Sequence, residues 1–191
     1  MSSTPSPFES INRYLDVAPA PGTAFGIDLG PRKGMLTPTD LLEITQLRQA
    51  LEPMIIELLM PRANRKQLDE LDALIQRHEQ LAVSARAGAM FMELDKRFHV
   101  YLAELTGNAR LTEIMRAVWD AQIRVGTSPA LHSLTNMAVL TQDHTRIVKA
   151  VRNADCAVAK EEVLDHIDRA YQMFTAHIAS IPGSGRGVND A

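Results

Sequence analysis

The chain has little of what marks disulfide-rich, membrane-spanning or secreted proteins. One cysteine, Cys156, stands among 191 residues, which excludes an intrachain disulfide and a zinc site built on several cysteines. A single thiol also fits a reducing compartment. No run of about 18 apolar residues occurs, so no part of the chain is expected to span a membrane. The N-terminus has no basic start followed by an apolar stretch, so no secretory signal is seen. These absences predict a cytoplasmic protein.

Aromatic residues and net charge are also scarce. Aromatics make up 5% of the chain, whereas apolar residues as a whole reach 46% and are dominated by Leu, Ala, Ile and Met. This mixture favours helices over a β-sandwich. The formal net charge of -3 provides no general attraction to nucleic acid or to an anionic membrane. A length of 191 residues suits one domain with a sizeable core.

The two ends of the chain differ from its middle. Residues 1–37 are rich in proline and glycine, a density that prevents long helices and regular sheets. We expect a flexible arm there, with at most a short helix at residues 8–15, and it either stays disordered or packs on a partner subunit. Residues 182–191 are expected to form a disordered tail. The folded domain is therefore predicted to cover residues 38–181.

From Thr37 onward the pattern is helical throughout. A capping start at residues 37–40 precedes an apolar stripe of three- and four-residue steps, formed by Ile44, Leu47, Leu51, Ile55, Leu58 and Leu59. Pro53 falls inside this stripe and is expected to kink or split the helix. Further helices are predicted at residues 64–85, 88–105, 109–125, 137–152 and 155–181, with stop signals such as Gly107-Asn108 between them. The predicted fold is an all-α antiparallel bundle of six or seven helices.

Four residues on three of these helices are expected to meet. Asp95 and His99 lie four apart and so project from one helix face. His144 lies nine residues before a predicted turn at residues 153–155, and His166 lies eleven residues after it. Both therefore stand roughly 15 Å from that turn, at one height of a helical hairpin. One carboxylate and three imidazoles suit Zn, Ni, Mn or Fe better than Ca or Mg, so we predict one divalent metal ion.

The other histidines fit this centre less well. His78 lies among Gln76, Arg77 and Glu79, which favours a solvated helix face. His177 follows His166 by eleven residues, roughly 16 Å along a helix, too far to share one ion. His132 lies in the predicted loop after Pro129, where it is a lid residue or has no role.

Three blocks of the sequence resemble one known family. LRQALE at residues 47–52, LDKRFHVYLAELTGNARLTEI at residues 94–114 and HTRIVKAVRNADCAVAKEEVLDHI at residues 144–167 are similar to the FCD domain. This domain is the effector-binding half of FadR-type GntR transcriptional regulators. The resemblance covers about residues 37–180.

The resemblance implies an antiparallel helical bundle with a central metal-containing pocket. The family's metal ligands fall on Asp95, His99, His144 and His166, and a small carboxylate usually completes the coordination. Arg48 and, more weakly, Arg124 match basic partners of that carboxylate. For Arg48 a surface or interhelical salt bridge is an equal alternative, and Asn108 is interpreted first as a helix cap and then as a pocket residue. FCD domains also associate through helix faces, so a homodimer is expected.

The resemblance departs from the regulators at the N-terminus. They carry a winged helix-turn-helix before this domain, whereas here about 37 residues precede it, with Arg13, Arg32 and Lys33 as their only Lys or Arg residues. We therefore expect no direct nucleic-acid binding from this chain, which is either a sensor that acts through a partner or a fragment of a longer regulator.

Three functions remain open at this stage. The first is a metal-containing sensor of a small organic acid. The second is a metal-dependent lyase or hydrolase acting on a carboxylate-bearing or aromatic substrate, with Glu93 and His132 as candidate acid/base groups. The third is a structural helical dimer without a metal.

Overall fold

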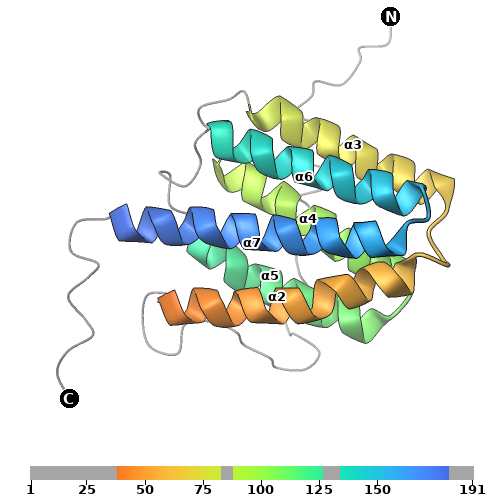
Figure 1. The fold of residues 1–191 in the computed structure, drawn as a ribbon, viewed down its shortest axis with the longest axis horizontal. Coiled ribbons are helices and arrows are strands. Elements are labelled where there is room, and N and C mark those ends of the chain that lie inside the picture. Colours follow the sequence, from red (N-terminus) through yellow and green to blue (C-terminus); the bar gives the residue numbers. More distant parts are fainter. Residues whose placement is uncertain (1–37, 83–87, 127–133, 181–191) are drawn as a thin grey trace, which may run out of the picture.

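A computed structural model describes residues 38–82, 88–126 and 134–180 of the chain, with side chains described for 38–81, 90–123 and 137–176. Within these ranges all regular structure is helical and no strand occurs, which confirms the all-α prediction. The six helices run back and forth in an antiparallel bundle (Figure 1). They are α2 (Pro38–Leu59), α3 (Arg65–Ala82), α4 (Gly88–Leu105), α5 (Ala109–Gly126), α6 (Leu134–Arg152) and α7 (Cys156–Ser180).

Short local signals set the turns that align these helices. After α4, Gly107 adopts a left-handed conformation (φ 69°), and Asn108 then caps α5 by accepting a hydrogen bond from the Leu111 N–H at 3.2 Å. After α6, Ala154 is left-handed (φ 56°), and Asp155 accepts a hydrogen bond from the Val158 N–H at 3.1 Å. The predicted stop at Gly107-Asn108 and the predicted turn at residues 153–155 are thus confirmed.

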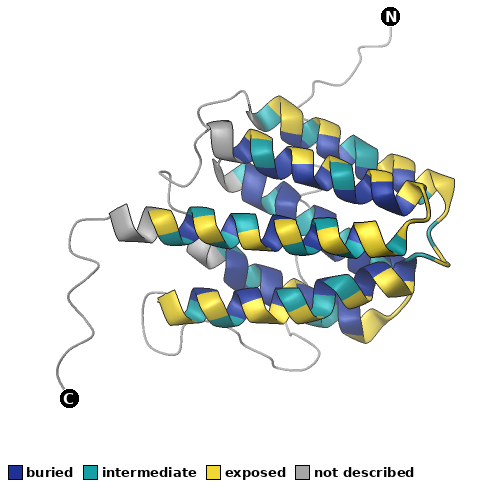
Figure 2. Ribbon diagram, in the orientation of Figure 1, coloured by how far each residue is buried: buried dark blue, intermediate teal, exposed yellow. Residues whose placement is uncertain are grey.

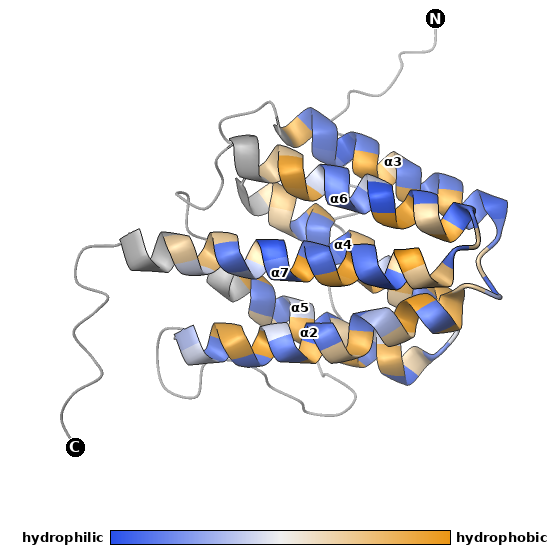
Figure 3. Cartoon of the chain, viewed as in Figure 1, coloured by the Kyte–Doolittle hydropathy of each residue, from blue (hydrophilic) through white to orange (hydrophobic). Residues whose placement is uncertain are grey.

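The helices bury a continuous apolar core. α2 packs against α7, α4 and α5, while α6 packs between α7 and α3, and α4 contacts both α3 and α5. The buried faces point inward and the exposed faces are largely hydrophilic, with apolar residues also exposed on α2 (Figures 2 and 3). Fully buried side chains of large volume include Trp119, Phe91, Phe98, Leu71 and Ile147. This core fixes the helix axes and so determines where the polar side chains within it must meet.

The structure corrects two expectations for α2. The helix continues through Pro53 as one element, so the expected split does not occur, while the expected kink stays a prediction. Its buried face also differs from the predicted stripe, because Leu47 and Leu58 are each 39% exposed. Arg48 and Glu52 take the inward positions instead. The three- and four-residue steps of the α2 sequence are compatible with two adjacent stripes on the helix surface. Packing against α4, α5 and α7 buries the stripe that contains Arg48 and Glu52.

Several sequence-based predictions lie outside the described residues. These are the N-terminal arm at residues 1–37, its short helix and the C-terminal tail at residues 182–191. Of the helices that the structure describes, none combines the length and the apolar character needed to cross a lipid bilayer.

Candidate metal centre

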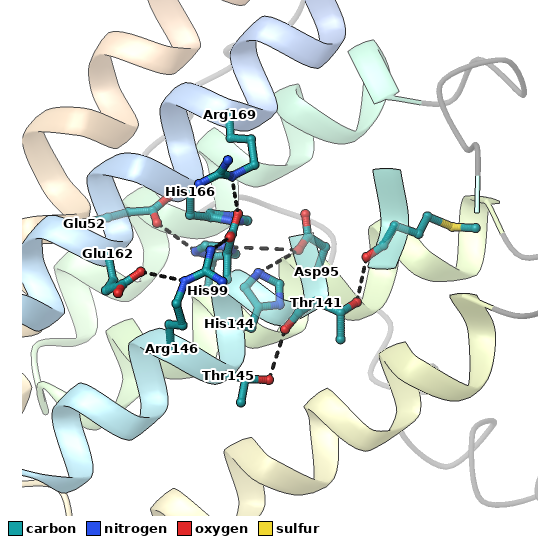
Figure 4. A network of polar contacts seen from close by, with 12 residues as sticks. Glu52, Asp95, His99, Thr141, His144, Thr145, Arg146, Glu162, His166 and Arg169 are labelled. Carbon is teal, nitrogen blue, oxygen red and sulfur yellow. Dashed lines mark hydrogen bonds and ion pairs between the residues drawn. The ribbon is translucent and has the colours of Figure 1, made fainter. Parts of the chain in front are cut away.

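The four residues predicted to meet do so in the middle of the bundle. Asp95 and His99 come from α4, His144 from α6 and His166 from α7, and all are buried. His144 Nε2 lies 3.1 Å from Asp95 Oδ1, His99 Nε2 lies 3.2 Å from His166 Nε2, and one ligand atom from each residue lies within 4.8 Å of the others (Figure 4). Ligands bound to one ion at about 2.1 Å stand about 3–3.5 Å apart, so the 3.1 and 3.2 Å separations suit a single small cation.

A carboxylate behind His99 completes one side of this cluster. Glu52 Oε2 lies 2.7 Å from His99 Nδ1, while Glu52 Oε1 accepts a hydrogen bond from Arg48 Nε at 2.7 Å. A carboxylate in this position fixes the tautomer that leaves the histidine Nε2 free to bind a cation. Sequence analysis missed Glu52. The signal was present, because Arg48 and Glu52 lie four apart, a spacing that keeps them on one face of a helix.

A second carboxylate stands behind His166. Asp143 Oδ2 lies 3.5 Å from His166 Nδ1, and Arg169 Nε donates to the same oxygen at 3.1 Å. Arg146 pairs with the other Asp143 oxygen and donates from Nε to Glu162 Oε2 at 2.9 Å (Figure 4). Asp143 was also missed, since its proximity to His166 depends on how α6 and α7 pack. His99 and His166 therefore each have a carboxylate on the nitrogen that faces away from the cluster.

Burial controls the charge states of the four predicted ligands. Burial lowers the pKa of His166 to about 4 despite the opposing effect of Asp143, and it lowers the pKa of His99 against the opposing effect of Glu52. Burial alone would raise the pKa of Asp95, but the hydrogen bond from His144 and the charges of the three histidines outweigh it and hold that pKa far below its usual range. The centre therefore presents an ionised carboxylate and, at His99 and His166, neutral imidazoles, which are the forms that bind metals.

The carboxylate of Glu52 is also kept ionised. Burial would raise the pKa of Glu52, yet the charge of Arg48 and the contact with His99 lower it to about 2. For Asp143, burial is likewise outweighed by His166 and the two arginines, which lower its pKa. Both carboxylates can therefore accept hydrogen bonds from ligand imidazoles near neutral pH.

His78 overturns its sequence-based interpretation. Its side chain on α3 is completely buried instead of solvated, with its ring centroid 5.2 Å from that of His144 and 4.9 Å from that of Phe91. Burial lowers the pKa of His78 to about 3, assisted by the nearby His144. The sequence carried the signal, because His78 continues the inward positions of Leu71, Leu74 and Ile75 at helical spacing.

Arg48 is buried beside the centre and not at the surface. Arg48 does form a salt bridge, as the alternative expected, but with Glu52 of the same helix and in the interior, neither at the surface nor between helices, and its role in ligand binding stays a prediction. The Arg48 guanidinium lies 4.3 Å from the centroid of the Trp119 ring, and this ring stacks on His99 at 4.5 Å. Three buried nitrogens here have no hydrogen-bond partner, namely Arg48 Nη2, Trp119 Nε1 and Gln122 Nε2. Trp119 and Gln122 were not singled out from the sequence.

The other candidate site residues either lie apart from the four clustered residues or have side chains outside the described residues. Asn108 is exposed and caps α5, which confirms its first interpretation, and its role as a pocket residue stays a prediction. Arg124 belongs to α5, but its side chain lies outside the described residues, as does His132. Glu93 precedes Asp95 by two positions on α4, which turns it about 160° around the helix from the ligand face.

Sequence comparisons relate the chain to transcriptional regulators. Residues 43–169 match the family model for the FCD domain. The Uxu operon transcriptional regulator of Escherichia coli is 28% identical over 134 residues, which is 68% of this chain and 52% of the regulator. The repressor NanR of Escherichia coli is 29% identical over 154 residues, covering 78% of this chain and 57% of NanR. The chain thus spans about half the length of the curated relatives it matches.

Solved structures show the same fold. A GntR protein of Streptococcus agalactiae matches with a TM-score of 0.59 and 24% identity, over 69% of this chain and 58% of that one. McbR/YncC of E. coli matches with a TM-score of 0.63 and 16% identity, over 73% of this chain and 66% of that one. The family model covers most of the described helices and the fold agrees, so this chain belongs to the FCD domain family found in GntR-type transcriptional regulators.

Proposed function

We propose that this FCD domain binds one divalent metal ion through Asp95, His99, His144 and His166, and that it senses a small organic acid at that centre. The observation that carries the proposal is the set of four buried ligand atoms within 4.8 Å of one another. Apart from their mutual contact at 3.1 Å, Asp95 Oδ1 and His144 Nε2 lack hydrogen-bond partners in the interior. Unpaired buried polar atoms cost free energy, about 1–3 kcal/mol each, and a bound cation would satisfy several of them at once.

The donor set limits the kind of ion. Three imidazole nitrogens and one carboxylate oxygen suit Zn, Ni, Mn or Fe. Such an ion, when bound, supplies a positive charge and coordination positions that a carboxylate can occupy. Glu52 and Asp143 would keep His99 and His166 in the tautomers that direct Nε2 to the ion.

Buried donors beside the centre support an acidic ligand. Arg48 Nη2, Trp119 Nε1 and Gln122 Nε2 are all N–H donors without a partner. Arg48 stacks on Trp119, and Trp119 stacks on His99, so the Arg48 guanidinium lies two ring contacts from a proposed metal ligand. A ligand rich in acceptor oxygens would pair with such donors. Arg124 stays a second proposed partner on α5, and Asn108 a third at its start.

Membership of the FCD family supports a sensory role. The related proteins are named as regulators and repressors, and this chain corresponds to about half of each. We therefore assign the chain to effector binding in transcription regulation, in preference to a lyase or hydrolase in the same pocket.

Removal of one imidazole tests the metal centre. In His144→Ala, we expect the bound metal to be lost. The rise in melting temperature that Zn²⁺ causes in the unmodified protein should also be absent, because a ligand that binds only the folded state stabilises it by mass action. Metal analysis after dialysis and thermal unfolding with and without Zn²⁺ measure this. His177→Ala is the matched control, since it removes an imidazole of α7 that is outside the ligand set. Unchanged metal content in His144→Ala would contradict the proposal.

The fluorescence of Trp119 tests the acidic ligand. The chain has one tryptophan, and its ring contacts both Arg48 and His99. Titration of the Zn²⁺-loaded protein with malate, citrate and glucuronate should change this emission for at least one acid, whereas the neutral amide of that acid should have no effect. In Arg48→Met we expect affinity to fall about tenfold or more, because a buried charged hydrogen bond is worth about 1.5–3 kcal/mol.

The same mixtures separate sensing from catalysis. After incubation, each acid should be recovered unchanged by mass spectrometry. Formation of a product that disappears in His99→Ala would favour the enzyme instead.

We also propose that the protein forms a homodimer through α2. Leu47, Met54 and Leu58 are 39–42% exposed, and Leu51 lies between them partly buried. Their spacing of four, three and four residues places them along one stripe of the helix. An apolar strip of this kind supports a helix–helix contact between two copies.

A further inference from the structure

His78 is a buried polar residue that the proposed metal set leaves unused. Its side chain on α3 has no exposed surface, and no side chain pairs with its ring nitrogens, which have the Phe91 backbone as their nearby hydrogen-bond partner. An imidazole nitrogen left unpaired in the interior costs roughly 1–3 kcal/mol. A leucine at this point would continue the apolar face of α3 without that cost. The residue therefore calls for a physical role inside the bundle.

The surroundings of His78 point to one ligand of the proposed centre. Its ring centroid lies 5.2 Å from that of His144 and 4.9 Å from that of Phe91. Phe98 covers His144 from another direction, with stacked rings 4.0 Å apart. Of the two rings that contact His78, only that of His144 carries polar atoms.

The proposed ligand histidines differ in their outer contacts. His99 Nδ1 lies 2.7 Å from Glu52, and His166 Nδ1 lies 3.5 Å from Asp143. His144 Nδ1 is also buried without a hydrogen-bond partner, and the ion-pair contact of His144 with a carboxylate is made by Nε2, with Asp95. Metal-binding histidines nearly always donate their second N–H to an acceptor, which fixes the tautomer and the ring orientation. One such acceptor is therefore still to be identified, and His78 is the histidine in ring contact with His144 that the proposed ligand set leaves unused.

We infer that His78 is a positioning residue that accepts a hydrogen bond from His144 Nδ1–H and so holds His144 Nε2 toward the metal. This inference rests on the proposed metal centre. A neutral imidazole carries one acceptor nitrogen and one N–H, so His78 can accept without any proton leaving His144. The terminal torsion of histidine is broad, and rings about 5 Å apart can bring two nitrogens to about 3 Å by rotating about it.

The bond itself can be observed in the unmodified protein. We would label the full chain with ¹⁵N-histidine, load it with Zn²⁺ and record imidazole correlation spectra. The expected result is a slowly exchanging His144 Nδ1–H with a scalar coupling to one nitrogen of His78. A resolved His144 resonance without that coupling overturns the inference, whatever the variants show.

Substitutions separate the hydrogen bond from the packing. His78→Leu removes the acceptor, His78→Gln keeps an acceptor oxygen on a flexible chain, and Phe91→Leu alters the neighbouring packing alone. In Co²⁺ titrations followed by visible absorption, we expect affinity to fall 10–100-fold in His78→Leu, as for other outer partners of metal ligands. His78→Gln and Phe91→Leu should stay within about threefold of the unmodified protein, since both retain an acceptor at residue 78.

The titration also separates this inference from the function on which it depends. If the unmodified protein fails to bind Co²⁺, the metal centre is wrong. If it binds Co²⁺ and His78→Leu binds equally well, only the role of His78 is wrong. Equal weakening in His78→Leu and His78→Gln would assign the effect to packing and also overturn the inference.

Discussion

At the scale of single residues, Glu52 contacts both a buried arginine and a proposed metal ligand. One carboxylate oxygen holds the Arg48 side chain of the same helix and the other faces His99 Nδ1. The side chains of Arg48 and Glu52 are each only 3% exposed, so water solvates neither charge and each depends on the other for compensation. The pair therefore holds a cation inside the bundle and positions a proposed metal ligand at the same time.

Breaking this pair should be costly, whereas removing it entirely should not. In Glu52→Leu, Arg48 becomes an uncompensated buried charge, and we expect a loss of about 3–5 kcal/mol in the free energy of unfolding. Arg48→Met combined with Glu52→Leu should recover at least half of that loss, because an apolar pair of similar volume avoids the desolvation cost. Urea unfolding of the metal-free chain measures both values.

An exposed ion pair provides the control for this comparison. Arg152 bonds to Asp72 at 2.6 Å and Asp69 at 3.0 Å, but these side chains are 35–58% exposed. Arg152→Met should therefore cost no more than about 1 kcal/mol. If Glu52→Leu costs as little as Arg152→Met, the interior around Arg48 is wetter than the structure indicates.

At the scale of helices, the turn between α6 and α7 sets the relative height of two proposed ligands. Asp155 caps the start of α7 through the Val158 N–H, and the Asp155 N–H donates to Ala150 O at 3.0 Å, which ties the turn to the end of α6. His144 and His166 are counted from this turn in opposite directions. The match of their heights, predicted from spacing alone, therefore depends on a local cap.

Loss of that cap should destabilise the hairpin without changing the core. In Asp155→Ala, we expect a loss of about 1 kcal/mol, within the usual 0.5–2 kcal/mol for an N-cap. Thermal unfolding checks the value. Asp155→Asn should retain most of the stability, because asparagine caps helices equally well. Equal destabilisation by alanine and asparagine would show that the carboxylate acts through its charge instead.

Local signals explain which elements could be predicted from the sequence. The bounds 88–105 expected for α4 agree with those observed, because a glycine in left-handed conformation and an asparagine cap end one helix and start the next. The rotation of α2 about its own axis was not predictable in this way. Leu47 and Arg48 are neighbours, and which of them faces inward depends on the helices that pack against α2.

At the scale of the whole molecule, each of the six described helices contributes to one centre. α4, α6 and α7 supply the proposed ligands, α2 supplies Glu52 and Arg48, α5 supplies Trp119, and α3 supplies His78. The meeting of the four proposed ligands could be predicted because helical spacing and a family resemblance both identify them. The contacts that Glu52, Asp143 and His78 make with these residues could not, since they join different helices and depend on tertiary packing, although helical spacing does place Glu52 beside Arg48 and His78 on the buried face of α3.

For the whole molecule, the apolar stripe of α2 predicts assembly into a homodimer. In Met54→Glu combined with Leu58→Glu, two carboxylates would face their copies across the proposed contact, and burying them unpaired costs several kcal/mol. We expect the unmodified protein to be a dimer at micromolar concentration and the double variant to be a monomer, as measured by light scattering. Such a loss should leave the melting temperature of the monomer fold nearly unchanged, because both side chains are about 40% exposed in one copy.

Leu42 provides a matched control for this test. It is also a leucine of α2 and is 40% exposed, but it precedes Leu47 by five positions and so points about 140° away around the helix. Leu42→Glu adds the same charge to the same helix without entering the stripe, and it should remain dimeric. A protein that is monomeric before any substitution would refute the dimer. Dissociation by Leu42→Glu as readily as by the double variant would place the contact elsewhere on α2.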